Sequence, residues 1–390
     1  MTTRSITRRI VPLVTAILTL ALAACGAPPT SPETSAPTVV APATAASKPV
    51  ATAAPTQAPK PTEAPAPTTL PEPTSTPKPA EAGASRSNPL PLGSEVRLKT
   101  WAVTITDVTR GKAALQAIAA ANQFNEKPRA GYEYLLASLR LENISEKQEA
   151  QHVAFGASLH VTGDHNVLYS SASVVEPKPL EGEVFPGGKV EGQIAFEVPS
   201  DEKNLMFQVE ESLAFDQPPV FVAIDEGARI VPDATLESIQ PSEIGTRRDA
   251  PAKPGETLTT SAWEITLLEV VRGKDAAKLA QEANQFNEVA PAGSEYIAVK
   301  LRVRAIGLDQ PDVARQVDGS FLKITGEKSV VYEKPSVVAP APELDAHLFP
   351  GGVTEGWEIL SVAAGEQKLT LIFKPLLSFS DDATRFLAIE

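Results

Sequence analysis

The sequence predicts an all-β protein made of two tandem β-sandwich domains, each carrying one short helical insertion. Three observations support this prediction. A long segment of the chain recurs, many short segments alternate apolar and polar residues, and each copy contains one Ala-rich stretch. Seven or so short alternating strands per copy, separated by turns rich in Gly and Pro, are typical of two packed antiparallel sheets.

The repeat is clearest at residues 122–126 (NQFNE), which return unchanged at 284–288, 162 positions later. Two one-residue insertions shift the offset to 164 at the later FPGG motif, residues 185–188 and 349–352. We therefore expect domains at 89–225 and 254–390, joined by a linker at 226–253 whose apolar residues favour packing against a domain. Further matched residues are Gly93 and Gly255, Trp101 and Trp263, Arg110 and Arg272, Lys112 and Lys274, and Tyr134 and Tyr296.

The elements follow from the alternation. In the first strand of each domain, every second residue is apolar, and the strand from Tyr296 to Arg304 alternates apolar residues with Lys and Arg. Alanine favours helix, so we expect short helices at 112–122 and 275–284. The FPGG motifs predict type II turns. The residues expected to face the cores include Trp101, Val103, Ile105, Leu135, Ala137, Leu139, Leu141, Leu159, Val161, Phe196, Val198, Leu205, Phe207, Val209, Trp263, Ile265, Leu267, Ile297, Val299, Leu301, Val303, Leu322, Ile324, Leu360, Val362, Leu369, Leu371 and Phe373.

The N-terminus has the features of an export signal. Three arginines precede an apolar run at 10–24, which is 15 residues long and so short for a membrane-spanning helix. The run ends in Leu-Ala-Ala-Cys25, which resembles the lipobox of bacterial lipoproteins. That resemblance implies a signal peptide at 1–24, a diacylglycerol on the Cys25 sulfur and a membrane-anchored protein facing the extracellular or periplasmic side. A buried or reactive thiol is the alternative for Cys25, and without a second cysteine no disulfide forms within the chain.

A low-complexity segment follows the anchor. Residues 26–88 contain 15 prolines and no aromatic residue, a composition that cannot bury enough apolar surface to fold. We expect residues 25–88 to form a disordered stalk that reaches on the order of 190 Å when fully extended. A plain spacer is the simplest role, and O-glycosylation of its threonines is the alternative.

The charge of the chain restricts its partners. The precursor has a formal net charge of −13, and removal of the three arginines of the signal peptide makes it −16. An acidic chain without a basic stripe or a Gly-rich phosphate loop is unsuited to bind nucleic acid or anionic lipid directly. We expect no nucleic-acid partner and no cofactor.

Three segments resemble telokin-like bacterial extracellular domains: NQFNEKPRAGYEYLLASLRLEN at 122–143, its counterpart NQFNEVAPAGSEYIAVKLRVRA at 284–305, and VEGQIAFEVP at 190–199. The resemblance covers most of residues 89–390. It implies an immunoglobulin-like sandwich of unassigned function, common in bacterial lipoproteins and related to a small secreted mycobacterial antigen, with no catalytic residues to transfer. The second copy departs from the first where Thr354 replaces Val190 and Trp357 replaces Gln193.

The candidate binding residues are polar positions in the repeated motifs. In one interpretation they present amides, an aromatic ring and a basic turn to a ligand. In the structural alternative, the Asn side chains bind backbone groups, Phe124 fills the core and the arginines are solvated. The candidates are Asn122, Gln123, Asn125, Arg110, Asn284, Gln285, Asn287, Arg272 and Trp357.

Signs of catalysis are weak. His152, His160 and His165 fall close together, but no spacing fits a zinc site, and His160 is expected to face solvent. No GxSxG motif or other nucleophile pattern is present, so we expect neither a metal site nor an enzyme. The sequence favours a non-catalytic binding module in the bacterial envelope, with an envelope protein or cell-wall glycan as partner. The alternatives are a structural spacer and an unrecognised envelope hydrolase.

Overall fold

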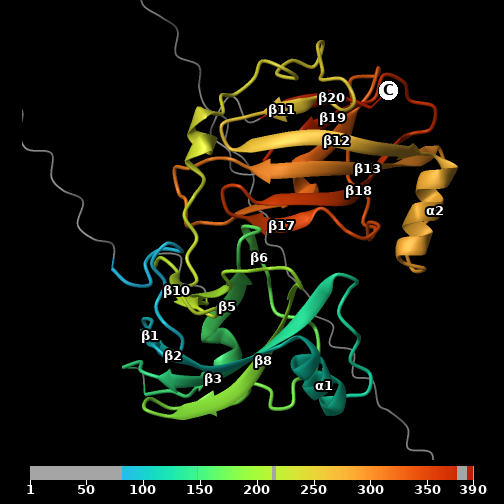
Figure 1. The fold of residues 1–390 in the computed structure, drawn as a ribbon. Coiled ribbons are helices and arrows are strands. Elements are labelled where there is room, and N and C mark those ends of the chain that lie inside the picture. Colours follow the sequence, from blue (N-terminus) through green and yellow to red (C-terminus); the bar gives the residue numbers. More distant parts are fainter. Residues whose placement is uncertain (1–80, 147, 213–216, 376–383, 390) are drawn as a thin grey trace, which may run out of the picture. The chain divides into compact units, whose positions relative to one another are not determined.

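The computed structural model describes residues 81–146, 148–212, 217–375 and 384–389. The predicted signal peptide, Cys25 and the stalk up to residue 80 lie outside these residues. In the described part of the chain, strands dominate and two α-helices are present, which confirms the prediction of an all-β fold (Figure 1). We call residues 81–225 the N-terminal half and residues 252–389 the C-terminal half.

The N-terminal half contains a four-stranded antiparallel sheet, β1-β2-β3-β8, and a three-stranded sheet, β10-β9-β5. A two-stranded pair, β4-β7, lies beside them. The elements are β1 (Glu95–Arg97), β2 (Trp101–Arg110), α1 (Gly111–Ala121), β3 (Tyr132–Asn143), β4 (Gln151–His152), η1 (Val153–Phe155), β5 (Ala157–Thr162), β6 (Val167–Leu168), β7 (Glu183–Val184), β8 (Lys189–Pro199), β9 (Met206–Glu211) and β10 (Val220–Ala223).

The C-terminal half has an equivalent four-stranded sheet, β11-β12-β13-β18, and a second sheet, β16-β15-β19-β20. A third sheet, β14-β17-β6, includes the short strand β6 from the N-terminal half. The elements are β11 (Thr257–Thr259), β12 (Trp263–Arg272), α2 (Lys274–Ala283), β13 (Ser294–Ala305), β14 (Arg315–Asp318), η3 (Gly319–Phe321), β15 (Leu322–Thr325), β16 (Val331–Tyr332), β17 (Asp345–Leu348), β18 (Val353–Ala363), β19 (Thr370–Phe373) and β20 (Arg385–Ala388).

Each half buries one core between its two main sheets. Trp101 and Trp263, the first residues of β2 and β12, are 2% and 4% exposed, and the alternating residues that follow them are buried as predicted. The pairing of β2 with β3 slips by one residue between Ile105 and Asp107, and the pairing of β12 with β13 slips at the same point. A β-bulge of one extra residue therefore interrupts both strands.

The two helices occupy the predicted positions within one residue at each end. Each follows an Arg-Gly turn in which the glycine has positive φ, 60° at Gly111 and 65° at Gly273, a backbone conformation that favours glycine. Ile118 of α1 and Ala280 of α2 are fully buried against the face of the four-stranded sheet that points away from the core. This second layer explains why β3 and β13 each contain four consecutive buried residues.

Residues 81–88 differ from the sequence prediction, which assigns them to the stalk. Arg86 is fully buried, and its guanidinium lies 3.8 Å from the centre of the Phe349 ring and donates to the side chain of Asn166. Burial lowers the pKa of Arg86 to about 10. The chain therefore becomes ordered before residue 88.

The linker at 226–253 also packs as expected, because its residues Ile230 and Leu236 are only 6% and 3% exposed.

Candidate functional site

The NQFNE turn leaves the C-terminal end of each helix. Asn122 caps α1, and its side-chain oxygen accepts a hydrogen bond from the backbone N–H of Phe124 at 3.0 Å. Asn284 does the same for Phe286 after α2, also at 3.0 Å. These are local turns in which asparagine replaces a backbone acceptor, so both Asn side chains are used within the chain.

The second asparagine of the motif joins the turn to a distant segment. The Asn125 amide donates to the carbonyls of Ile118 and Val175, at 2.9 and 2.8 Å, and its oxygen accepts from the Val175 N–H at 2.9 Å. In the C-terminal half, the Asn287 amide donates to the carbonyls of Ala280 and Val338, at 2.7 and 2.8 Å. Its oxygen accepts from the Val338 N–H at 2.8 Å. Each side chain thus links a helix end to a loop 50 or so residues away.

A buried tyrosine fixes the far end of the turn. The Tyr134 hydroxyl donates to the carbonyl of Glu126 at 2.9 Å, and the Tyr296 hydroxyl donates to the carbonyl of Glu288 at 3.0 Å. Burial raises the pKa of both tyrosines, so both hydroxyls remain protonated donors at neutral pH. The motif is therefore held at both ends and in the middle.

The aromatic residue at the centre of each turn points into solvent. Phe124 is 80% exposed and Phe286 is 82% exposed. The expectation that Phe124 fills the core is wrong, because α1 already covers the sheet with Ala114 and Ile118 and the turn directs Phe124 outward. The asparagine part of the structural interpretation agrees with the contacts above.

The residue before each phenylalanine is also exposed. Within the described part of the chain, no hydrogen bond engages the side-chain amide of Gln123 or of Gln285. The structure therefore divides the candidate residues into asparagines that hold the turn and a Gln–Phe pair that it presents. We call residues 123–124 and 285–286 the Gln–Phe tips.

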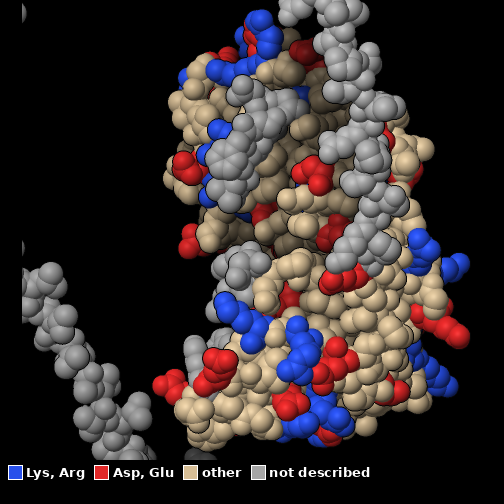
Figure 2. All heavy atoms as spheres, turned by 90° about the vertical axis from the view of Figure 1, so that its left-hand side faces the viewer, with Lys and Arg blue, Asp and Glu red and all other residues tan. Residues whose placement is uncertain are grey.

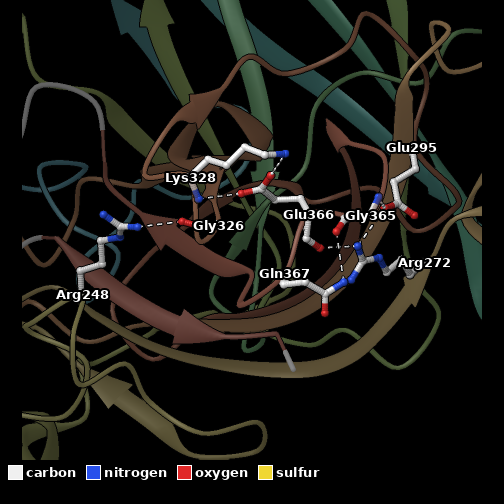
Figure 3. Close-up of polar contacts among 8 residues, drawn as sticks. All are labelled: Arg248, Arg272, Glu295, Gly326, Lys328, Gly365, Glu366 and Gln367. Atoms are coloured by element: carbon white, nitrogen blue, oxygen red, sulfur yellow. Dashed lines mark hydrogen bonds and ion pairs between the residues drawn. The ribbon is translucent and has the colours of Figure 1, made fainter.

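Arg110 and Arg272 stabilise the fold instead of facing solvent. The Arg110 Nε donates to Glu133 at 2.6 Å, and the Arg272 guanidinium contacts Glu295 at 2.8 Å (Figure 3). Both guanidinium groups also donate to a main-chain carbonyl, that of Glu202 at 3.2 Å and that of Glu366 at 2.5 Å. The hydrogen bond from Arg272 is the main reason that the pKa of Glu295 is lowered. The prediction that the charges of the Arg-Gly-Lys turn are solvated is wrong for these two arginines.

Two equivalent buried carboxylates were not found from the sequence. Glu202 accepts from the His165 N–H at 2.8 Å and from the Tyr169 hydroxyl at 2.6 Å. Glu366 accepts from the Lys328 N–H at 2.9 Å, and its other oxygen lies 2.7 Å from the Lys328 ammonium (Figure 3). Burial raises the pKa of Glu202, whereas the hydrogen bond from Lys328 lowers the pKa of Glu366. The two acids are 164 positions apart, the same offset as the two FPGG motifs. This match could have identified them in the sequence as equivalent positions of the repeat.

Trp357 and the histidines are the remaining candidate residues, and their surroundings give less support for a binding site. Trp357, in β18, is partly buried and packs against the cluster beneath α2, so it is not the centre of an exposed aromatic patch. The His160 side chain is only 22% exposed, which corrects the expectation that it faces solvent, and burial lowers its pKa. Among the described residues, no three His, Cys, Asp or Glu side chains lie close enough to hold a metal ion.

Figure 2 shows how charged side chains are distributed on one face of the molecule. On the face drawn in Figure 2, acidic and basic side chains are interspersed, and uncharged residues form most of the surface. No helix in the described residues is long and apolar enough to span a membrane.

A family model described as a domain of unknown function (DUF4352) matches residues 90–220. No curated protein matches the chain. Solved structures that are similar to it include the yjhA protein from Bacillus subtilis, with 16% identity over 35% of this chain and 99% of that chain and a TM-score of 0.26. An uncharacterized β-sandwich protein from Clostridium difficile 630 has 11% identity over 38% of this chain and 100% of that chain, with a TM-score of 0.24.

The ycdA structure from Bacillus subtilis subsp. subtilis str. 168, described as a provisionally assigned lipoprotein, has 16% identity over 34% of this chain and a TM-score of 0.25. This chain spans 38% of the length of that structure.

Proposed function

We propose that this protein is a lipid-anchored envelope lipoprotein that serves as a non-catalytic binding module. In this proposal its two halves are copies of one telokin-like, immunoglobulin-like domain. The observation that carries the proposal is the pair of Gln–Phe tips. The same two side chains are exposed at the same position of both halves, and the same three kinds of hydrogen bond hold the turn beneath them.

The energetics of the tips favour binding over a purely structural role. An exposed phenylalanine adds almost nothing to stability, because its ring stays in contact with water in the folded protein. The turn that carries it is nevertheless fixed by Asn125 in one half and Asn287 in the other. A preorganised group loses little conformational freedom when it binds, and this lowers the cost of association.

The anchor and the stalk complete the proposal. A lipid on Cys25 holds the chain at the membrane, and the Pro-rich stalk gives the two halves reach. Two similar sites on one tethered chain raise the apparent affinity for a partner that offers more than one binding position.

The test uses the full mature chain with Cys25→Ser, which cannot be acylated. Binding to envelope fractions from the protein's own cells is measured as a function of concentration. We expect saturable binding that is lost in the double variant Phe124→Ala/Phe286→Ala. Phe185→Ala is the matched control, because Phe185 is also exposed, at 64%, but lies outside the tips. Absence of saturable binding, or equal binding by the double variant, contradicts the proposal.

A further inference from the structure

We propose that each Gln–Phe tip binds an uncharged glycan, with the phenylalanine ring stacked on a sugar ring and the glutamine amide hydrogen-bonded to its hydroxyl groups. This inference rests on the binding function proposed above and specifies the chemical class of the partner.

The side chains of a tip match the chemistry of a sugar. A pyranose has a face of C–H bonds, whose positive polarisation suits the negative face of an aromatic ring. Its rim carries hydroxyl groups that both donate and accept. A glutamine amide supplies two donors and one acceptor, and the amides of Gln123 and Gln285 have no hydrogen-bond partner within the described residues. One tip can therefore contact the face and the rim of one sugar residue together.

The surroundings of the tips disfavour an apolar protein groove as the partner. Central residues of protein interfaces are surrounded by further contacts that exclude water. Beside the Phe124 turn, the exposed apolar neighbour is Val175, at 46%, while Gln123 and Glu126 are exposed and polar. Beside the Phe286 turn, Val338 and Val289 are 46% and 74% exposed. A single ring with one or two small valines suits a narrow ligand better than a broad apolar surface.

Charge disfavours membranes and anionic polymers. Membrane-surface segments combine apolar residues with a basic face, which adds attraction to anionic lipid. The NQFNE turns instead carry exposed Glu126 and Glu288; exposed Lys127 and Arg129 follow in the N-terminal half, but no basic residue follows up to Tyr296 in the other, and the chain without its signal peptide has a net charge of −16. Like charges would repel a phosphate-rich polymer or an anionic bilayer. An uncharged polyhydroxylated strand avoids this repulsion.

The duplication fits a repetitive ligand. A single stacked ring gives weak binding, because even the contact between two aromatic rings contributes only about 0.5–1.5 kcal/mol. Two tips on one chain convert the second contact into an intramolecular step when the ligand is a repeating polymer. We therefore expect weak binding of a short oligosaccharide and stronger binding of the polymer.

The test compares three preparations with the full Cys25→Ser chain: intact envelopes, wall glycan freed of protein and lipid by hot detergent and protease, and the same glycan after removal of phosphate-containing polymers with hydrofluoric acid. We expect saturable binding to all three. Phe124→Ala and Phe286→Ala should each weaken binding about two- to twelvefold, and the double variant more than either single variant, whereas Phe185→Ala should leave it unchanged. Titration with chitotetraose, a neutral oligosaccharide, should shift the side-chain amide NMR signals of Gln123 and Gln285.

The other outcomes separate the two proposals. Tip-dependent binding to intact envelopes that disappears after protease treatment overturns the glycan inference and leaves the binding function standing. Binding that disappears after removal of the phosphate polymers also overturns it. Glycan binding that survives the double variant rejects the tips as the site. No saturable binding to any preparation rejects both proposals.

Discussion

Replacing Asn287 with alanine removes the link between α2 and the loop that contains Val338. The side chain makes three hydrogen bonds there, two from its amide to the carbonyls of Ala280 and Val338 and one from the Val338 N–H to its oxygen. Alanine can make none of them. Asn287 is 8% exposed, so water reaches the abandoned groups poorly.

The expected cost follows from these contacts. Each hydrogen bond contributes about 0.5–1.5 kcal/mol, which gives a loss of about 1.5–4.5 kcal/mol in the free energy of unfolding of the C-terminal half. The buried position places Asn287→Ala in the upper part of this range. Asn125→Ala breaks the equivalent bonds at a less buried position, so we expect its loss in the lower part.

Urea denaturation of the full chain measures the loss, and hydrogen exchange at the Val338 N–H localises it. Gln285→Ala is the matched control, because it removes an exposed amide with no partner in the described residues and should change stability by less than about 0.5 kcal/mol. The reasoning is refuted when Asn287→Ala costs no more than this control, or when exchange at Val338 stays as slow as in the parent chain.

Four further predictions concern the other polar groups and the anchor. Burial raises the pKa of Glu202 above its ordinary 4.5, so its contribution to stability is present at low pH and is lost as pH rises through the folded pKa; Glu202→Gln should flatten this dependence in urea midpoints measured from pH 4 to 8. The pKa of Glu366 is lowered from its ordinary 4.5, so its contribution has the opposite sign and is lost as pH falls below 4.5; this loss should disappear in Glu366→Gln when the urea midpoints are extended below pH 4, and equal slopes for the two variants would refute the assignment. Arg272→Ala should destabilise the C-terminal half by about 1.5–3 kcal/mol in urea denaturation, with only partial recovery in Arg272→Lys, which lacks the forked geometry; full recovery would mean that charge alone matters. Cys25→Ser should move the protein from the membrane pellet to the supernatant, and continued sedimentation with membranes would refute the lipid anchor.

The strands and helices were predictable because their signals are local. Alternation identified the buried faces of β2, β3 and β13, and alanine content placed both helices within one residue. Side chains that fill a core recur at regular spacing in the sequence. Because the sequence repeats, the elements predicted in one half could be compared with those predicted in the other.

The orientation of single side chains was less predictable. Phenylalanine is usually buried, so Phe124 was expected in the core, yet Ala114 and Ile118 already fill the space under α1. Glu202 and Glu366 look like ordinary surface acids in the sequence, and their partners His165 and Lys328 lie nearly 40 residues away. Contacts of this kind depend on tertiary folding and leave no local pattern.

The β-bulge near Ile105 changes which residues of β2 face the core. Before the bulge these are odd-numbered positions, and after it they are even-numbered positions. Counted without interruption from Trp101, Arg110 would fall on the outer face of the sheet. The extra residue moves it to the opposite face, where it pairs with Leu135 of the core and reaches the carbonyl of Glu202. The bulge in β12 moves Arg272 in the same way. A one-residue deletion at either bulge would therefore exchange the two faces of the last residues of the strand. The arginine would turn away from the core and lose its hydrogen bond to the carbonyl of Glu202 or Glu366, so that the four-stranded sheet would lose this link to the loop before the second sheet.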